Sequence, residues 1–203
     1  QLVYLPATQL EPGKVVTHAA ATIGVLDAGV YPEGNCKLVD EVTTALNENG
    51  FSARPNPTVM RFKYGKLIMN LGNALAAVSP PGDKTKEIQS QLRTEAETCF
   101  AIAGIDCASP EEGKVRRGNL MKQSSVAGQD RVAGSSWQSL ARGTGNIETD
   151  FLNGEIVLLG RLHGIPTPAN LTLQRLANHL ASGGGPPQSI PLAEVQRQIE
   201  GAH

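Results

Sequence analysis

One predicted helix carries a lysine and two asparagines whose spacing would place them together. Lys66, Asn70 and Asn73 stand at positions i, i+4 and i+7 of residues 58–78, where apolar residues recur with helical spacing. On a helix the three side chains fall within about 60° of one another, away from the apolar stripe. A lysine can donate a proton to a carbonyl under reduction, and amides can orient polar ligand groups. The alternative is a solvated helix face that merely tolerates the asparagines.

A second polar group lies further along the chain, and capping is its simplest explanation. Ser135 or Ser136 could be the N-cap of a following helix. Glu148 and Asp150 could offset the dipole of the next helix from its first turn. No metal site is predicted, because the histidines at 18, 163 and 179 have no acidic or Cys/His partners at metal-ligand spacing.

The elements that must position these residues change type along the chain. Short apolar runs separated by turn residues predict strands at 2–5, 15–17, 23–26 and 51–54, with a helix at 36–49 between the last two. Further helices are predicted at 58–78, 84–105, 110–123, 135–142, 148–163, 168–180 and 192–199. The breaker Pro55-Asn56-Pro57 is typical of a domain boundary. The predicted fold is mostly α: an incomplete α/β unit over residues 1–57, then an all-helical domain over 58–203.

Composition excludes several classes of protein. The 203 residues hold 18 Lys+Arg and 19 Asp+Glu, a net charge of −1, so there is no basic excess for nucleic-acid binding. No apolar run approaches the ~20 residues of a membrane span. Three cysteines without metal spacing favour a reducing compartment over a disulfide framework, and we expect a cytoplasmic protein.

Several motifs are distinctive in combination. They are Lys66-Leu-x-x-Asn70, Ser135-Ser136 with Glu148 twelve residues after Ser136, Asp150-Phe-Leu-Asn-Gly154-Glu, and His163-Gly-Ile-Pro-Thr-Pro168. With these motifs the sequence resembles the ketopantoate reductases (2-dehydropantoate 2-reductases) over residues 1–181. The resemblance implies a Rossmann domain followed by a helical domain of the 6-phosphogluconate dehydrogenase C-terminal type. It also implies NADPH-dependent reduction of 2-dehydropantoate to pantoate, in pantothenate and coenzyme A biosynthesis.

The resemblance implies a role for each site residue. Lys66 would be the general acid, and Asn70 would bind the keto acid substrate, with Asn73 as a substitute for the family's second asparagine. Ser136 would hold the substrate carboxylate, and Glu148 would bridge the substrate hydroxyl and the cofactor ribose.

Two departures from the family pattern leave alternatives open. The family spaces its second asparagine four residues after the first, whereas Asn73 follows Asn70 by three. The glycine-rich phosphate loop, G-x-G-x-x-G, does not occur in the sequence, so we expect the C-terminal portion of an enzyme, inactive by itself. The alternatives are a reductase of another 2-keto acid and a non-catalytic helical dimerisation module. A homodimer through the helical domain is compatible with the resemblance, and the sequence leaves the oligomeric state open.

Overall fold

The chain forms two compact units that do not follow the predicted boundary. The computed structural model describes residues 1–19, 21–122, 134–143 and 145–202. The first unit combines Gln1–Lys66 with Asp106–Arg131, and the second combines Leu67–Ile105 with Val132–His203. The predicted division after residue 57 therefore differs from the structural one, because residues 58–66 and the segment after residue 105 pack with the N-terminal strands.

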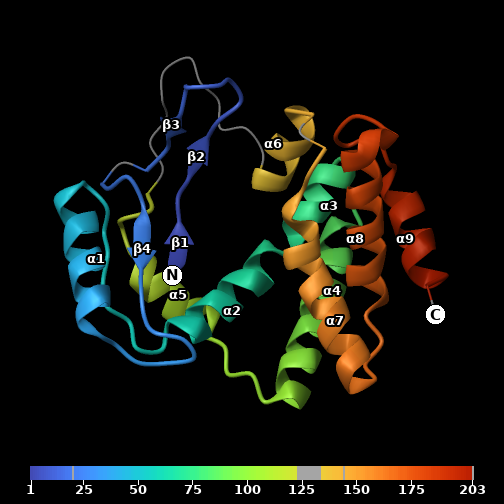
Figure 1. Cartoon of the computed structure of the whole chain (residues 1–203). Helices are drawn as coiled ribbons and strands as arrows, with labels where there is room; N and C mark the ends of the chain where they lie inside the picture. The colour runs from blue at the N-terminus through green and yellow to red at the C-terminus, as the bar shows by residue number, and fades with distance from the viewer. Residues whose placement is uncertain (20, 123–133, 144, 203) are drawn as a thin grey trace. The chain divides into compact units, whose positions relative to one another are not determined.

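The first unit is built on two short antiparallel strand pairs. Strand β1 (Leu2–Tyr4) pairs with β4 (Val25–Asp27), and β2 (Ala7–Thr8) pairs with β3 (Val16–Thr17) (Figure 1). Helix α1 (Lys37–Glu48) follows, as its apolar spacing predicted. The predicted strand at 51–54 forms only isolated parallel bridges, Val25 with Ser52 and Ala28 with Pro55. The prediction of a strand at residues 51–54 is therefore wrong, although this segment does lie along β4.

One helix and the first part of another, up to Lys66, complete the first unit. Helix α2 (Val59–Asn70) begins with Val59, which is buried in a cluster with Leu2, Tyr4 and Val25. Helix α5 (Pro110–Arg117) begins with a capping box, in which Ser109 accepts from the Glu112 backbone and the Glu112 side chain accepts in return. Helix α5 ends at Arg117. The predicted end is residue 123, six residues later, and that residue lies outside the described part of the chain.

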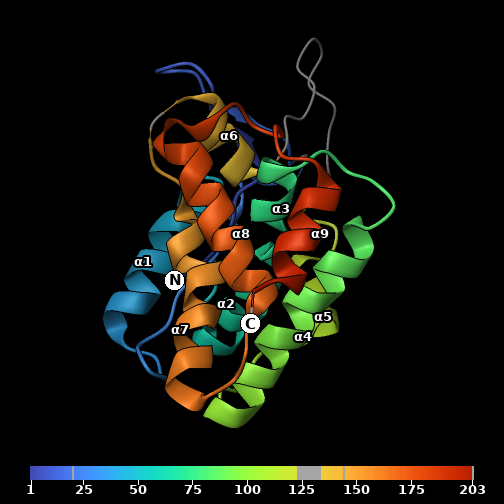
Figure 2. The same ribbon diagram turned by 90° about the vertical axis from the view of Figure 1, so that its right-hand side faces the viewer.

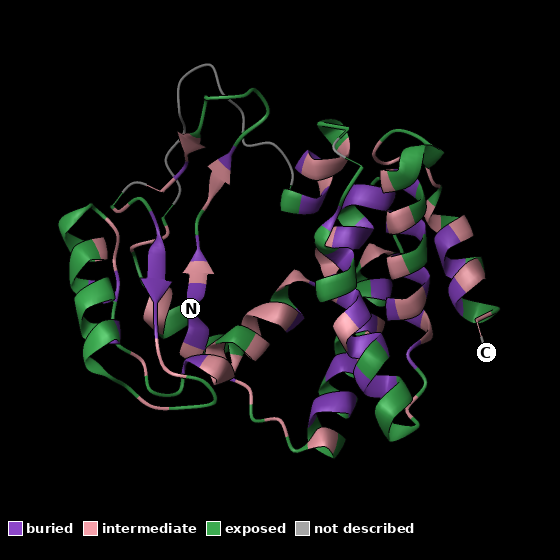
Figure 3. Ribbon diagram, viewed as in Figure 1, coloured by how far each residue is buried: buried purple, intermediate pink, exposed green. Residues whose placement is uncertain are grey.

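The second unit is a helical bundle centred on α8 (Pro168–His179). Its other helices are α3 (Gly72–Val78), α4 (Thr85–Ala103), α6 (Ser135–Ala141), α7 (Asn153–His163) and α9 (Leu192–Glu200). Helix α8 packs against α3, α4, α7 and α9 (Figure 2). Buried positions concentrate on α3, α7 and α8, whereas α1 of the first unit is largely exposed (Figure 3). The all-helical prediction for this part of the chain is confirmed.

Three predicted helices differ in detail from the structure. The predicted helix at 58–78 is interrupted at Leu71, which separates α2 from α3. At this residue the N–H group donates to Ile68 O, three residues earlier, at 3.4 Å. The helix at 148–163 begins as a 3₁₀ turn, η1 (Glu148–Phe151), before α7. The helix at 168–180 continues into a π turn, η2 (Leu180–Gly184), which ends where Gly183 adopts φ 99°. No helix among the described residues is long and apolar enough to cross a membrane.

Candidate active site

Lys66 lies against a buried aromatic ring. It lies one turn before the end of α2, is half-buried, and its Nζ lies 5.5 Å from the centre of the Tyr4 ring. Tyr4 is only 7% exposed and belongs to the apolar cluster of the first unit. A cation over the face of an aromatic ring is attracted by the ring quadrupole. The Lys66 Nζ thus lies beside a ring whose own position is fixed by packing.

Asn70 follows Lys66 on the same helix, but Asn73 does not. Lys66 and Asn70 stand one turn apart on α2 and therefore share a face. The Asn70 side chain is half-buried and makes no hydrogen bond with any residue that the structure describes. Asn73 belongs to α3, beyond the interruption at Leu71. The predicted helix is therefore interrupted between the two asparagines, and a shared face for all three side chains stays a prediction.

Asn73 instead lies beside Gly134, the residue that precedes α6. A Cβ built on Gly134 would stand 3.3 Å from Asn73 Oδ1, and helices α3 and α6 pack together. Ser136, in the first turn of α6, is only 3% exposed. Its Oγ has no hydrogen-bond partner within the described part of the chain. The N-cap of α6 is Gly134, so the capping interpretation of Ser135 and Ser136 is wrong.

The two carboxylates of η1 have different surroundings. Glu148 is exposed and forms no ion pair or hydrogen bond with the described residues. Asp150 accepts hydrogen bonds from Gln174 Nε2 and Asn178 Nδ2, both at 2.7 Å, and so ties η1 to α8. Asp150 therefore has a structural role, whereas the Glu148 carboxylate is available to a ligand.

The site residues that the sequence predicts are divided between the two units. Lys66 belongs to the first unit, whereas Asn70, Asn73, Ser136 and Glu148 belong to the second. Within the second unit, the packing of α3 on α6 brings Asn73 and Ser136 to neighbouring elements. The use of all five residues on one ligand remains a prediction.

The fully buried Asn153, a motif residue of the resemblance, holds the bundle together through Asn170. Asn153 Nδ2 donates to Asn170 Oδ1 at 3.0 Å and lies 3.3 Å from Leu71 O, at the interruption between α2 and α3. Asn170 Nδ2 donates to Leu92 O at 3.2 Å and to Glu95 Oε2 at 2.7 Å. Both asparagines are 0% exposed, and together they join α3, α4, α7 and α8. Such fully hydrogen-bonded polar networks specify one arrangement of a core.

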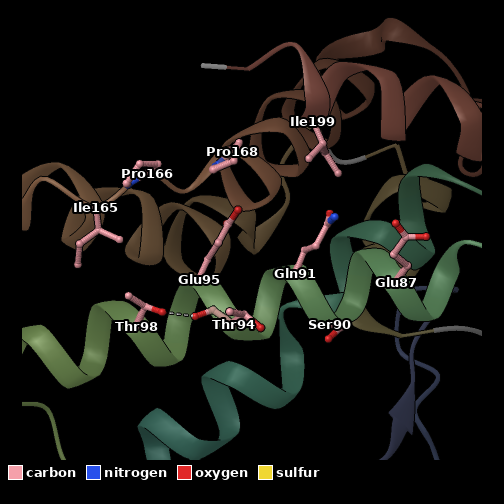
Figure 4. Close-up of a pocket in the computed structure, with 10 residues that line it drawn as sticks. All are labelled: Glu87, Ser90, Gln91, Thr94, Glu95, Thr98, Ile165, Pro166, Pro168 and Ile199. Atoms are coloured by element: carbon pink, nitrogen blue, oxygen red, sulfur yellow. Dashed lines mark hydrogen bonds between the residues drawn. The ribbon is translucent and has the colours of Figure 1, made fainter.

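A groove in the second unit was missed by the sequence reasoning. It has a volume of about 660 Å³ and lies between α4, the segment before α8, and α9. Figure 4 shows Glu95 and Gln91 extending from α4 toward Pro168 and Ile199. None of the five predicted site residues lines it. The signal that could have revealed it is Glu95 itself, a carboxylate beside the apolar stripe of Ile88 and Leu92.

Glu95 caps α8 from a neighbouring helix. Its carboxylate accepts from the backbone N–H groups of Ala169 and Asn170, at 2.8 and 3.0 Å, in addition to the Asn170 side chain. Burial raises the pKa of Glu95, and these hydrogen bonds oppose the rise without cancelling it. The groove is therefore lined by a residue with a structural task. Among the described residues there is no group of three or more His, Cys, Asp or Glu that could hold a metal ion.

Comparisons with known proteins identify the family. The family described as "Ketopantoate reductase PanE/ApbA C terminal" matches residues 37–181, most of the chain. The chain therefore belongs to the ketopantoate reductase family, and the matched part is the C-terminal region of these oxidoreductases.

Individual relatives agree with this assignment. The chain is 26% identical over 182 residues to a 2-dehydropantoate 2-reductase of Pyrococcus horikoshii, covering 86% of this chain and 57% of that protein. A PanE/ApbA family ketopantoate reductase structure from Ralstonia eutropha has a TM-score of 0.67 at 25% identity, covering 90% of this chain and 58% of the other. A ternary structure of D-mandelate dehydrogenase with NADH and anilino(oxo)acetate has a TM-score of 0.69 at 18% identity, with coverages of 89% and 59%. This last likeness concerns the fold alone. The chain thus spans somewhat more than half the length of these relatives.

Proposed function

We propose that the chain is part of an NADPH-dependent 2-dehydropantoate 2-reductase, which forms pantoate for pantothenate and coenzyme A synthesis. The observation that carries the proposal is the pair on α2: Lys66 is held against the Tyr4 ring, and one turn later stands Asn70, whose amide has no hydrogen-bond partner among the described residues. The Pyrococcus horikoshii relative, named for this reaction, supports the choice of substrate.

In this proposal each residue acts on a different part of the keto acid. Lys66 donates a proton to the ketone oxygen as it becomes an alcohol, and Asn70 and Asn73 hydrogen-bond the polar groups of the substrate. The buried Ser136 hydroxyl, without a partner among the described residues, donates to the substrate carboxylate.

The cofactor contacts proposed for this chain are limited to Glu148. Its exposed carboxylate, unpaired among the described residues, fits the ribose hydroxyls of NADPH as an acceptor, and it also accepts from the substrate hydroxyl. When bound, the nicotinamide supplies the hydride.

A second candidate function is the reduction of another 2-keto acid. The specific observation is that Asn73 lies on α3, beyond the interruption at Leu71, and at a spacing that differs from the family pattern. A non-catalytic dimerisation module is the third interpretation, and exposed Leu158 and Leu162, one turn apart on α7, are the apolar pair that would serve it.

The test uses the protein as its gene encodes it, assayed with NADPH and a panel of 2-keto acids that includes 2-dehydropantoate. Lys66→Ala should lower kcat by roughly 10²–10⁴, the range for a positioned general acid. Lys63→Ala is the matched control, because Lys63 is an exposed lysine on the same helix. A tenfold or smaller loss with an unchanged pH profile removes Lys66 from this role. No turnover of any keto acid favours the dimerisation module.

A further inference from the structure

The Tyr4 ring holds a second cation besides Lys66. The guanidinium carbon of Arg117 lies 4.9 Å from the centre of this ring, and Lys66 Nζ lies 5.5 Å from it. The ring is itself fixed, because Tyr4 is 7% exposed and lies in the cluster with Leu2, Val25 and Val59. Two positive groups that would repel each other in water are thus kept within 6 Å of one ring centre.

Arg117 lies at the end of its helix, beside a glycine one turn earlier. Arg117 is the last residue of α5, and a Cβ at Gly113, one turn earlier, would stand only 3.1 Å from Arg117 Nη1. Gly113 therefore leaves the space in which the guanidinium lies. The adjacent Arg116 anchors the same turn of α5, since it donates to the buried Asp27 carboxylate of β4.

Arg117 differs from the other arginines that join elements of this unit. Arg61 is paired with Asp106 and Glu112, and Arg116 is paired with Asp27. Arg117 is half-buried, yet it forms no hydrogen bond or ion pair with any described residue. A guanidinium carries five N–H donors in a planar fork that matches the oxygens of a carboxylate or phosphate.

We propose that Arg117 binds an oxyanion of the ligand on which Lys66 acts, with the Tyr4 ring holding both cations in place. The inference rests on the proposed function for the role of Lys66. A 2-keto acid carries a carboxylate next to its ketone, and in the proposed function Lys66 acts on the ketone. Arg117, which belongs to the same unit as Lys66 and contacts the same ring, supplies a positive charge for an oxyanion, through a bidentate pair with the carboxylate or with a phosphate of the dinucleotide.

The first experiment titrates the 203-residue chain and follows the Arg117 Nε–Hε signal by NMR. Pyruvate and inorganic phosphate are added separately, at constant ionic strength set with NaCl. We expect a saturating shift with a dissociation constant in the millimolar range, about 4 kcal/mol or less. Saturation by pyruvate identifies the substrate carboxylate as the partner, and saturation by phosphate alone identifies the cofactor. A linear response to both anions overturns the proposal.

Variants distinguish a specific anion site at Arg117 from a general effect of net charge. Arg117→Gln should weaken the affinity, read from backbone amide shifts around Tyr4, at least tenfold. Arg54→Gln removes the same charge from an exposed position of the same unit and should leave the affinity unchanged. Tyr4→Phe keeps the ring and should bind the anion with the affinity of the parent. Tyr4→Leu removes the ring and should bind the anion at least threefold more weakly. Equal losses in Arg54→Gln and Arg117→Gln would show that only net charge matters, and would overturn the proposal.

The outcome for Arg117 is distinguishable from that for the proposed reaction. If Arg117 binds the anion but Lys66→Ala retains its kcat in the gene-encoded protein, the proposed function fails and the oxyanion site stands. If Lys66→Ala loses kcat but Arg117→Gln binds both anions as before, the oxyanion site fails and the proposed function stands.

Discussion

The Arg116 guanidinium donates to both oxygens of the Asp27 carboxylate, with Nη2–Oδ1 at 2.6 Å and Nε–Oδ2 at 2.7 Å. The two side chains are only 8% and 2% exposed. Ser52 O also accepts from Arg116, and Asp27 also accepts from the backbone N–H of Arg54. The pair joins β4 to α5 across 89 residues of sequence, and so assigns the segment after residue 105 to the first unit.

Breaking this pair from one side should be costly. Asp27→Asn leaves a buried guanidinium without its counter-ion, and we expect the free energy of unfolding to fall by about 3–5 kcal/mol in urea titrations. Glu41→Gln breaks the exposed pair with Lys37 and should change it by less than about 1 kcal/mol. Similar small losses in both variants would contradict the structural role of the buried pair.

The amides of Asn153 and Asn170 should be coupled energetically. Asn153→Ala leaves the Asn170 Oδ1 without its buried donor and should destabilise the chain by at least about 2 kcal/mol. A double-mutant cycle with Asn170→Ala should give a coupling energy of about 0.5–3 kcal/mol. Asn49→Ala is the control, because that amide is exposed and bonds to Ala45 O on its own helix. A coupling energy near zero would mean that the two amides act independently.

Glu95 should make the stability of the chain depend on pH. Burial raises the pKa of this carboxyl above its ordinary value of 4.5, so the folded chain holds the proton more tightly than the unfolded chain does. Its contribution to stability is therefore greatest below pH 4.5 and is lost as the pH rises through the folded pKa. We therefore expect the parent to lose stability relative to Glu95→Gln as the pH rises from 4 to 7, measured as the unfolding free energy of the parent minus that of the variant.

The control for this pH series is Glu97→Gln, which changes an exposed carboxylate on the same helix. Urea midpoints measured at each pH give the comparison. If the parent gains stability over Glu95→Gln as the pH rises, the hydrogen bonds from residues 169 and 170 outweigh burial, and the expected sign is wrong.

Ser136→Ala separates a binding role from a structural one. Because Ser136 Oγ is buried without a partner among the described residues, its removal should change the free energy of unfolding by less than about 0.5 kcal/mol. In the gene-encoded protein the same change should raise the KM for the keto acid about tenfold, since a hydrogen bond to a charged group contributes about 1.5–3 kcal/mol. Ser135→Ala, at the exposed neighbouring position, should leave KM unchanged. A loss of stability above about 1 kcal/mol with an unchanged KM would make Ser136 structural.

Local spacing was sufficient to predict most helices of the second unit. The apolar residues Ile88, Leu92 and Ala96 recur with helical spacing, and the structure buries all three on α4. The helix predicted at 84–105 therefore differs from α4 by only one or two residues at each end. The interruption at Leu71 carries no such signal, because residues 59–78 have helical character on both sides of it.

By itself, the sequence determined the types of the elements, the mostly α character of the chain and its resemblance to the ketopantoate reductases. These properties depend on short-range spacing and on motifs of a few residues. Only the tertiary structure decided that residues 59–66 and α5 join the N-terminal strands, that Arg117 shares the Tyr4 ring with Lys66, and that Glu95 caps α8. The physical reason is that the sequence shows which helix faces must be buried and which charged side chains must be paired. Which residue provides the partner depends on contacts between residues far apart in the chain.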